Sequence, residues 1–306
     1  MLSECFENLK SNLELSPTYQ GQISTHHKAV RSVIENADPG IRTALIGSLQ
    51  RSTRIPPREE DTFDIDILIE LGQFDRWVPI GGITPREALH RLATNIGQSD
   101  RYGSKSPYAD APTICFHYED DVKVELVPAY CDNIAMAPDG TPCPPKGRGY
   151  WIPSSEGTWK HADYDHDAEQ ITEMNKVTSG WLVPTIKMLK ALKRQFFPNM
   201  SSFQLEVLAY HSVPAILLAD LRAGRGFSYP SLISGFFAFA VSQLCQPLRL
   251  KDSNSPAATV SQEHIPNTQH AILVLSKYTS SLLTASTERE QIAGWKELYG
   301  DLLPIN

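Results

Sequence analysis

The sequence lacks long apolar runs and a secretion signal. None of its segments approaches the roughly 20 apolar residues that a helix needs to span a bilayer. The most apolar run, residues 232–241, is about half that length and contains Ser234 and Gly235. The N-terminus is mixed and acidic, without a basic segment that leads into an apolar one. We therefore expect neither a signal peptide nor a membrane span.

The sequence also has few cysteines and no excess of basic charge. Its five cysteines are odd in number, widely spaced and without a C-x-x-C pair, which argues against a disulfide framework and a zinc site and favours a reducing cytoplasm. The net charge of −7 lacks the basic footprint of proteins that coat long nucleic acid. Small anionic substrates that arrive with Mg²⁺ are compatible with this charge, because the metal supplies the positive charge. P-loop and H-E-x-x-H motifs are absent.

The patterns that are present change from mixed to helical along the chain. The expected elements are a helix within residues 1–37 that ends at Asp38-Pro39-Gly40, a β run at 41–48, a polar loop at 50–63, an alternating strand at 63–71, a helix at 85–96, a hairpin of 112–120 with 122–130, a long loop at 131–165, helical segments at 171–196, 201–224, 231–248, 268–286 and 289–301, and a polar linker at 251–268. We predict an α+β fold, in which residues 1–165 form a mixed sheet with an N-terminal helix and residues 166–306 form a helical half packed beside it.

Three acidic residues lie on the predicted strands. Asp64 and Asp66 are two residues apart, so both project from one face of their strand. Side chains about 6–7 Å apart can share two Mg²⁺ ions, and Mg²⁺ prefers hard oxygen ligands. A third carboxylate, Glu125, would hold a metal next to an attacking hydroxyl group. The alternative is an exposed strand face with solvated charges, with Glu125 as an edge-strand charge.

Gly47 and Ser48 follow the first β run. A glycine allows the backbone to approach a phosphate closely, and backbone N–H groups together with the Ser48 hydroxyl would bind phosphate oxygens. With the acids, this pair predicts in-line attack on an α-phosphate, with pyrophosphate as the leaving group. The alternative for the pair is an ordinary turn.

At GS…DID…VELVPA the sequence resembles the polymerase-β-type nucleotidyltransferases, and most closely the cGAS/DncV-like nucleotidyltransferases (CD-NTases). These are bacterial enzymes that make cyclic oligonucleotide signals in antiphage defence (CBASS). The resemblance covers roughly residues 20–304 and is carried by GSLQRSTRI, VKVELVPAY, TIKMLKALKR with SSFQLEVLAY, and GWKELYGDLLP. It implies a polymerase-β-like catalytic domain in residues 1–165 and an oligoadenylate-synthase-like helical domain in residues 166–306 that closes the nucleotide cleft.

The resemblance also implies roles for individual residues. The implied set is Asp64, Asp66 and Glu125 as catalytic metal ligands, Gly47 and Ser48 as the triphosphate-binding turn, Lys190 and Lys187 as phosphate contacts, Ser202 as a triphosphate contact, and Phe203 as a base-stacking aromatic. Several alternatives stay open. The lysines would otherwise form a solvated helix face, Phe203 would belong to the core, and Ser202 would compete with Ser201 as a helix N-cap. Arg51 and Arg54 either contact phosphates or only decorate their loop.

The implied enzyme uses two Mg²⁺ ions, for which Mn²⁺ can substitute. Its substrates are ATP, GTP or a pyrimidine NTP, and its product is a cyclic di- or trinucleotide that a downstream effector reads. The third acid is Glu where many relatives have Asp. A zinc insertion is absent, which favours regulation by a protein partner or constitutive activity over activation by DNA. Two alternatives remain, a linear transferase that adds nucleotides to an oligonucleotide, RNA or protein, and a catalytically silent nucleotide-binding regulator.

Overall fold

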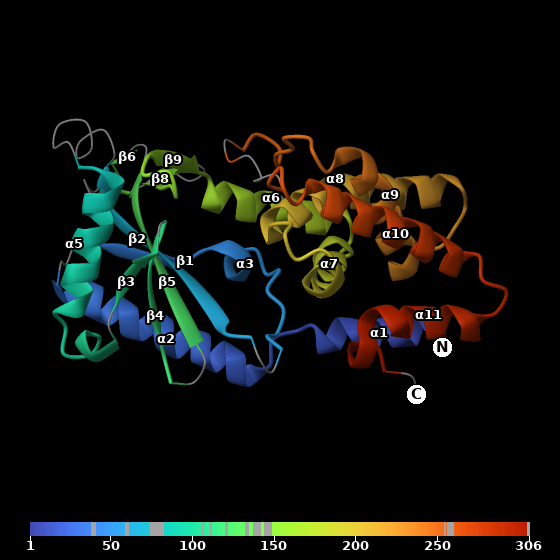
Figure 1. Cartoon of the computed structure of the whole chain (residues 1–306), viewed down its shortest axis with the longest axis horizontal. Coiled ribbons are helices and arrows are strands. Elements are labelled where there is room, and N and C mark those ends of the chain that lie inside the picture. The colour runs from blue at the N-terminus through green and yellow to red at the C-terminus, as the bar shows by residue number, and fades with distance from the viewer. Residues whose placement is uncertain are drawn as a thin grey trace.

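The computed structural model describes residues 1–37, 41–58, 61–73, 83–105, 107–110, 112–119, 122–131, 135–136, 142–143, 149–253, 255 and 260–304. Three predicted features lie wholly or partly outside these residues: the helix end at 38–40, the hairpin turn at 120–121 and the first part of the loop at 131–165. A sheet with helices α2 and α5 beside it forms one half of the molecule, and helices α6 to α11 form the other (Figure 1). The predicted α+β fold is confirmed.

The main sheet is mixed. Its strands, in spatial order, are β1 (Arg42–Leu45), β2 (Phe63–Gln73), β5 (Val122–Cys131), β4 (Thr113–His117) and β3 (Tyr108–Asp110), and the hairpin of β8 (Tyr150–Pro153) and β9 (Trp159–Ala162) pairs with the end of β5. Strands β2 and β5 run parallel. The other pairs are antiparallel. Two short strands, β6 (Ala135–Met136) and β7 (Pro142–Cys143), pair with each other.

One face of this sheet is apolar. Its buried residues are Phe63, Ile65, Ile67 and Ile69 of β2 with Val122, Val124 and Leu126 of β5, and they pack with apolar residues of α2 (Pro17–Ala37) and α5 (Pro85–Gly97). Because side chains alternate along a strand, burying this face leaves the even-numbered residues of β2 on the other side. Thr84 and Glu87 form a capping box that begins α5, which confirms the predicted helix there.

The helical half is built from six helices and the N-terminal segment. The helices are α6 (Tyr164–Val177), α7 (Leu182–Phe196), α8 (Ser202–Arg222), α9 (Tyr229–Gln243), α10 (Ile265–Leu283) and α11 (Glu288–Tyr299). Helix α1 (Leu2–Asn12) lies beside α11 (Figure 1), where Phe6 packs edge-on against Trp295. The N-terminal region thus divides its two helices between the halves of the molecule. The predicted domain division after residue 165 stays a prediction.

Three local expectations differ from the structure. The segment 171–196 is broken between α6 and α7, where Ser179 and Gly180 have φ angles of 51° and 84°, because left-handed residues end a right-handed helix. The predicted loop at 131–165 contains the β8–β9 hairpin, whose aromatic residues favour strands despite the nearby glycines and prolines. A one-turn helix, α3 (Gly47–Gln50), replaces the end of the predicted β run at 41–48 and leads into the predicted polar loop.

Helix α8 is the one helix of the described residues that is long and apolar enough to cross a membrane. Somewhat more than half of its most apolar stretch is buried inside the molecule. This burial is what a core helix shows, and length and composition alone are weak grounds for a membrane span.

Candidate active site

The pairing of β2 with β5 places the three predicted acids on one face of the sheet. Asp66 is the register partner of Glu125, and Asp64 is the partner of Lys123. Register partners project from the same face, and it is the face opposite the isoleucines of β2. Two strands about 60 residues apart in sequence thus bring Asp64, Asp66 and Glu125 together, as their alternation in the sequence predicts.

The three carboxylates have different neighbours. Burial, and then the charge of Glu125, raises the pKa of Asp66 to about 6. Glu125 accepts a hydrogen bond from Lys123 Nζ at 2.6 Å, whereas Asp64 Oδ2 lies 3.6 Å from Nη2 of Arg54. Burial and the neighbouring carboxylate thus oppose the ionised form of Asp66, and a bound cation would relieve this penalty.

Gly47 lies directly against Asp66. Its φ angle is 69°, and a Cβ atom at this position would come within 2.7 Å of Asp66 Oδ2. The backbone N–H of Ile46 also donates to the carbonyl of Asp66 at 3.0 Å. Only glycine permits both the left-handed backbone and this close approach. The start of α3, with Ser48, is thereby held beside the acidic face.

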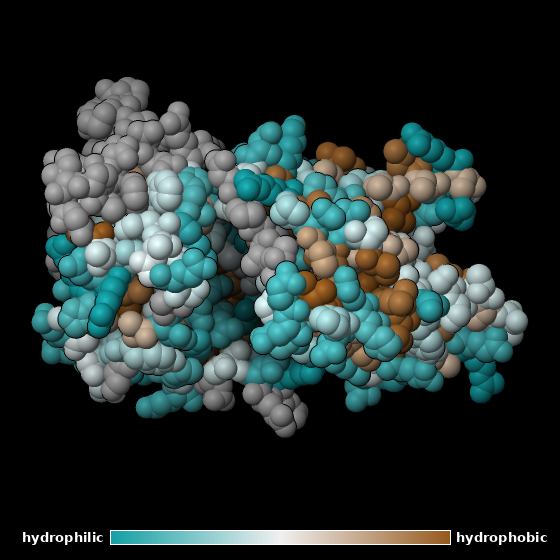
Figure 2. All heavy atoms as spheres, turned by 45° about the horizontal axis from the view of Figure 1, so that its top comes forward, coloured by the Kyte–Doolittle hydropathy of each residue, from teal (hydrophilic) through white to brown (hydrophobic). Residues whose placement is uncertain are grey.

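A small cavity of about 90 Å³ lies next to this turn. It is lined by Ser48, Arg54, Ile55, Lys190, Lys193, Arg194 and Ser202. The cavity brings together Ser48 of α3, Lys190 of α7 and Ser202 of α8, which the sequence predicts as phosphate contacts. Four cationic side chains and two hydroxyl groups around one space are the chemistry that binds phosphate oxygens. In Figure 2 the surface is hollowed between the two halves, and hydrophilic atoms lie within the hollow.

A buried ion-pair network lies under this cavity. Glu206 of α8 is fully buried and accepts from Arg51 Nε at 2.5 Å and from Thr53 Oγ1 at 2.8 Å. Lys190 Nζ lies 2.6 Å from Glu206 Oε1, the oxygen that also accepts from Thr53. Burial alone would raise the pKa of Glu206, but the charges of Arg51 and Lys190 hold it at about 2. Burial lowers the pKa of Lys190 to about 8, so both partners are charged at pH 7.

The network contains residues that the sequence analysis missed. Glu206 is a single charge inside the apolar segment FQLEVLA, and charged residues are rarely buried without a partner. That isolated charge is the signal that would have identified it. Thr53 carries no such signal, because its hydroxyl role appears only when α7 and α8 pack against the loop.

The remaining predicted nucleotide contacts lie outside the cavity lining. Arg51 pairs with Glu206, and its guanidinium packs over the Phe203 ring, 4.8 Å from the ring centre. Phe203 is half-buried and packs partly against the helical core. Lys187 Nζ donates to Glu14 Oε2 at 2.7 Å, away from the cavity.

The two serines at the N-terminus of α8 have different roles. The Ser201 hydroxyl accepts from the backbone N–H of Gln204 at 3.0 Å and is the N-cap. Ser202 is exposed in the first turn and lines the cavity. Its hydroxyl is thus available for a ligand rather than used for capping.

The acidic face fits hard metal ions by its chemistry but is not preassembled. Within the described residues, no group of three or more His, Cys, Asp or Glu side chains is close enough to hold a metal ion as it stands. Glu125 is bonded to Lys123 and Asp64 faces Arg54. Three carboxylates on one face, one of them with a raised pKa, suit Mg²⁺. A cation would need to draw two of them from their present partners.

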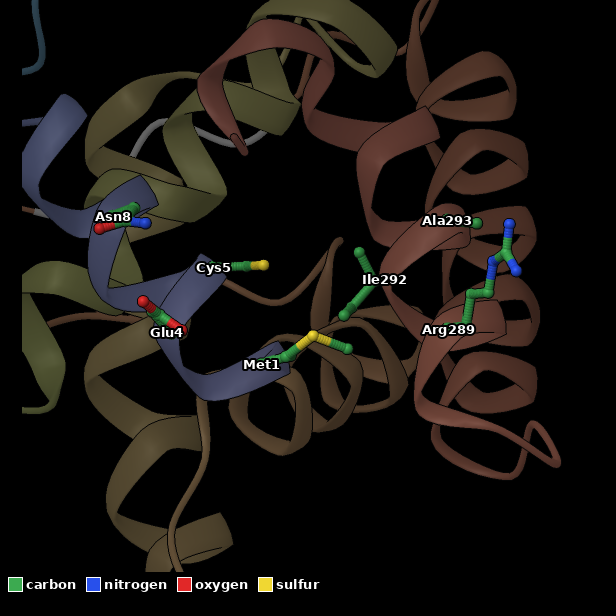
Figure 3. Close-up of a pocket in the computed structure, with 7 residues that line it drawn as sticks. All are labelled: Met1, Glu4, Cys5, Asn8, Arg289, Ile292 and Ala293. Atoms are coloured by element: carbon green, nitrogen blue, oxygen red, sulfur yellow. The ribbon is translucent and has the colours of Figure 1, made fainter. Parts of the chain in front are cut away.

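A different cavity lies far from these residues. It has a volume of about 390 Å³ and is lined by residues of α1 and α11, among them Cys5 and Ile292 (Figure 3). None of the predicted site residues lines it. Its position at the outer end of the helical half separates it from the acidic face.

The family model for the Second Messenger Oligonucleotide or Dinucleotide Synthetase (SMODS) domain matches residues 1–175. The chain belongs to this family. The match spans both helices of the N-terminal region, the entire sheet and most of α6, and therefore all three acids. No curated protein matches the chain in sequence.

Solved structures of CD-NTases have the same fold as this SMODS protein. CdnC of Escherichia coli MS115-1, solved in a complex with HORMA-deltaN, is 15% identical with a TM-score of 0.70, over 99% of this chain and 98% of that one. The c-UMP-AMP synthase CdnE of Rhodothermus marinus, solved with Apcpp and Upnpp, is 15% identical with a TM-score of 0.62, over 90% and 96%. The cyclic AMP-GMP synthase DncV of Vibrio cholerae is 12% identical with a TM-score of 0.61, over 99% and 87%. The suspected CD-NTase relationship is confirmed.

Proposed function

We propose that this chain joins NTPs into a cyclic di- or trinucleotide second messenger and releases pyrophosphate. The observation that supports this most is the parallel register of β2 and β5, in which Asp66 stands opposite Glu125 with Asp64 on the same face. The SMODS match describes synthetases of such products. An acidic face beside a small cationic cavity is the arrangement that phosphoryl transfer needs, because it separates metal ligands from phosphate contacts.

Asp64, Asp66 and Glu125 would hold two Mg²⁺ ions, for which Mn²⁺ can substitute. When bound, these ions stabilise the charge on the attacking and leaving oxygens. Glu125 accepts the proton of the attacking hydroxyl, directly or through solvent. Gly47 brings the start of α3 against the triphosphate, while Ser48, Lys190 and Ser202 contact its oxygens.

For a cyclic dinucleotide the bond changes balance in two rounds, and a trinucleotide needs one further round of elongation, with loss of one more pyrophosphate, before the ring closes. A 3′- or 2′-hydroxyl oxygen attacks the α-phosphorus of the donor NTP, the bond to pyrophosphate breaks, and the hydroxyl proton passes to the base. The linear product then binds in the reverse orientation, and the same exchange closes the ring with loss of a second pyrophosphate. Phe203 stacks a base during each round. The Arg51 guanidinium packs over the Phe203 ring and holds it in place.

The family supports a proposal for the cellular setting. We propose a cytoplasmic enzyme of antiphage defence whose product is read by a downstream effector. The CdnC structure solved with HORMA-deltaN supports a regulatory protein partner for this chain as well. The net charge of −7 disfavours long nucleic acid as acceptor or activator.

The test is incubation with all four NTPs and Mg²⁺, then Mn²⁺, followed by phosphatase treatment and mass spectrometry. We expect a phosphatase-resistant product with the mass of two or three nucleoside monophosphates less one water for each. Linear products with removable end phosphates would support the linear transferase instead. Binding of NTPs without any release of pyrophosphate would indicate a silent regulator. The matched control is the same reaction with Asp64→Asn and Asp66→Asn combined.

A further inference from the structure

Lys123 lies on the acidic face, although no motif singles it out. It precedes Glu125 by two residues on β5, so both side chains project from the same side of the strand. On β2 its register partner is Asp64. Lys123 Nζ donates to Glu125 Oε1 at 2.6 Å, and the two side chains are only 20% and 25% exposed.

This ion pair competes with any metal for Glu125. A divalent cation that binds Glu125 must displace the ammonium group or lie beside it, and like charges a few ångströms apart repel strongly where solvent is scarce. The contact between Arg54 and Asp64 is looser, at 3.6 Å. The charges of Arg54 and Arg51 also act on Asp66, but no salt bridge joins them to it among the described residues. Glu125 is therefore the acid that is hardest for a free metal ion to recruit.

A nucleotide changes this balance. An NTP with its metal brings several negative phosphate charges to the same face, and these offset the charge of Lys123 together with that of the metal. The ammonium group then has phosphate oxygens as alternative partners. Release of Glu125 becomes favourable only with the nucleotide in place.

We propose that Lys123 is a positioning residue that withholds Glu125 from free divalent ions and releases it to the metal–nucleotide complex. This inference rests on the proposed function. It makes the metal site complete only when the substrate is bound, so the third carboxylate is positioned at the moment when it is needed. Lys123 acts here through Glu125 and need not touch the reacting atoms.

The experiment measures Mn²⁺ binding to the full chain by electron paramagnetic resonance, first without nucleotide. We expect Lys123→Gln to bind Mn²⁺ about tenfold more tightly than the wild type, because one competing charge is gone. Lys123→Arg keeps the charge and should stay within about twofold of the wild type. Lys160→Gln, which removes an exposed lysine from β9 of the same sheet, is the matched control and should show no change.

The second arm repeats the titration with a saturating non-hydrolysable ATP analogue. The difference between Lys123→Gln and the wild type should shrink to within about threefold, because the phosphates now offset the lysine. Adding Asp66→Asn to Lys123→Gln should remove the gain, which places the ion on the acidic face. Lys123→Met serves as a second neutral variant if Lys123→Gln does not fold, as judged by circular dichroism.

Two results would overturn the inference. One is equal Mn²⁺ affinity of Lys123→Gln and the wild type without nucleotide, and the other is a difference that persists unchanged when the analogue is bound. Failure of the proposed function is distinguishable from both. If the Mn²⁺ titrations behave as expected but no variant releases pyrophosphate from NTPs, the synthase proposal fails while the competition for Glu125 stands.

Discussion

Asp66 and Glu206 are two poorly exposed carboxylates whose pKa values shift in opposite directions. Burial and the charge of Glu125 raise the pKa of Asp66 to about 6. Glu206 is buried completely, yet the charges of Arg51 and Lys190 hold its pKa at about 2. Burial opposes ionisation in both cases, so the partners decide the outcome.

The difference separates a structural charge from a functional one. Glu206 has three donors and joins α8 to α7 and to the loop after α3, so its ionised form stabilises the packing of the two halves. Asp66 shares its face with two other carboxylates, so its ionised form destabilises the fold. Charges that lower stability are characteristic of sites that bind cations or carry out chemistry.

The largest expected effect is on turnover. Asp64→Asn combined with Asp66→Asn should lower pyrophosphate release by about a thousandfold or more, because the metal ligands on β2 are lost. The variant should stay folded, since amides replace carboxylates of the same shape. Pyrophosphate release and circular dichroism measure the two effects. Activity that survives the double change in the presence of Mg²⁺ would exclude the proposed mechanism.

The next effect tests the structural charge. Glu206→Gln leaves Arg51 and Lys190 buried without a counter-ion and should lower the free energy of unfolding by about 3–5 kcal/mol. Urea denaturation measures this change. Asp220→Asn is the control, because Asp220 is also buried but its Arg225 partner is 62% exposed. A loss at Glu206 no larger than the loss at Asp220 would contradict a special role for the network.

The pH dependence of stability should distinguish the two carboxylates. A raised pKa in the folded state means that Asp66 favours folding when protonated, so its contribution is present below pH 3.8 and is lost as the pH rises through about 6. Asp66→Asn should therefore be more stable than the wild type by on the order of 2 kcal/mol above pH 6, and equal to it below about pH 3. Thermal unfolding across this range measures the difference. Asp100→Asn, at an exposed position, is the control and should show no such window.

Gly47 tests the contact that holds α3 against the acidic face. Gly47→Ala adds a Cβ atom within 2.7 Å of Asp66 Oδ2 and should cost about 1–3 kcal/mol of stability, with a parallel loss of turnover. Gly224→Ala is a matched control, because Gly224 has a similar φ of 66° but nothing within 4 Å of its added Cβ. The excess cost at Gly47 over Gly224 measures the steric contact with Asp66. Equal costs would show that backbone strain alone explains the glycine.

The smallest effect is expected at Lys187. Its partner Glu14 is 55% exposed, so Lys187→Ala should lower the free energy of unfolding by about 1 kcal/mol or less. Turnover and the KM for NTP should stay within about twofold of the wild type, whereas Lys190→Ala should reduce both stability and turnover. A large rise in the KM for NTP in Lys187→Ala would show instead that Lys187 contacts the phosphates.

The sequence predicted correctly those strands and helices whose signals lie within a short stretch of residues. The alternation of Asp64, Ile65 and Asp66 predicted the strand and its two faces, because side-chain direction reverses at each residue. The helix after Pro85 was predicted from its residue pattern after a loop rich in Gly and Pro. The β8–β9 hairpin was missed, because the Pro and Gly content around it is typical of loops. The break at Ser179 and Gly180 was missed, because an isolated glycine is tolerated inside a helical pattern and a left-handed serine leaves no reliable mark in one sequence.

The sequence by itself determined that Asp64 and Asp66 share a face, since two-residue spacing on a strand is a matter of backbone geometry. Only the tertiary structure decided which cation each carboxylate meets. Arg51 and Glu206 are 155 residues apart in the chain, and Lys123 faces Asp64 only through the register of β5 with β2. Charge interactions depend on distance and burial, and both are set when the halves of the molecule pack together.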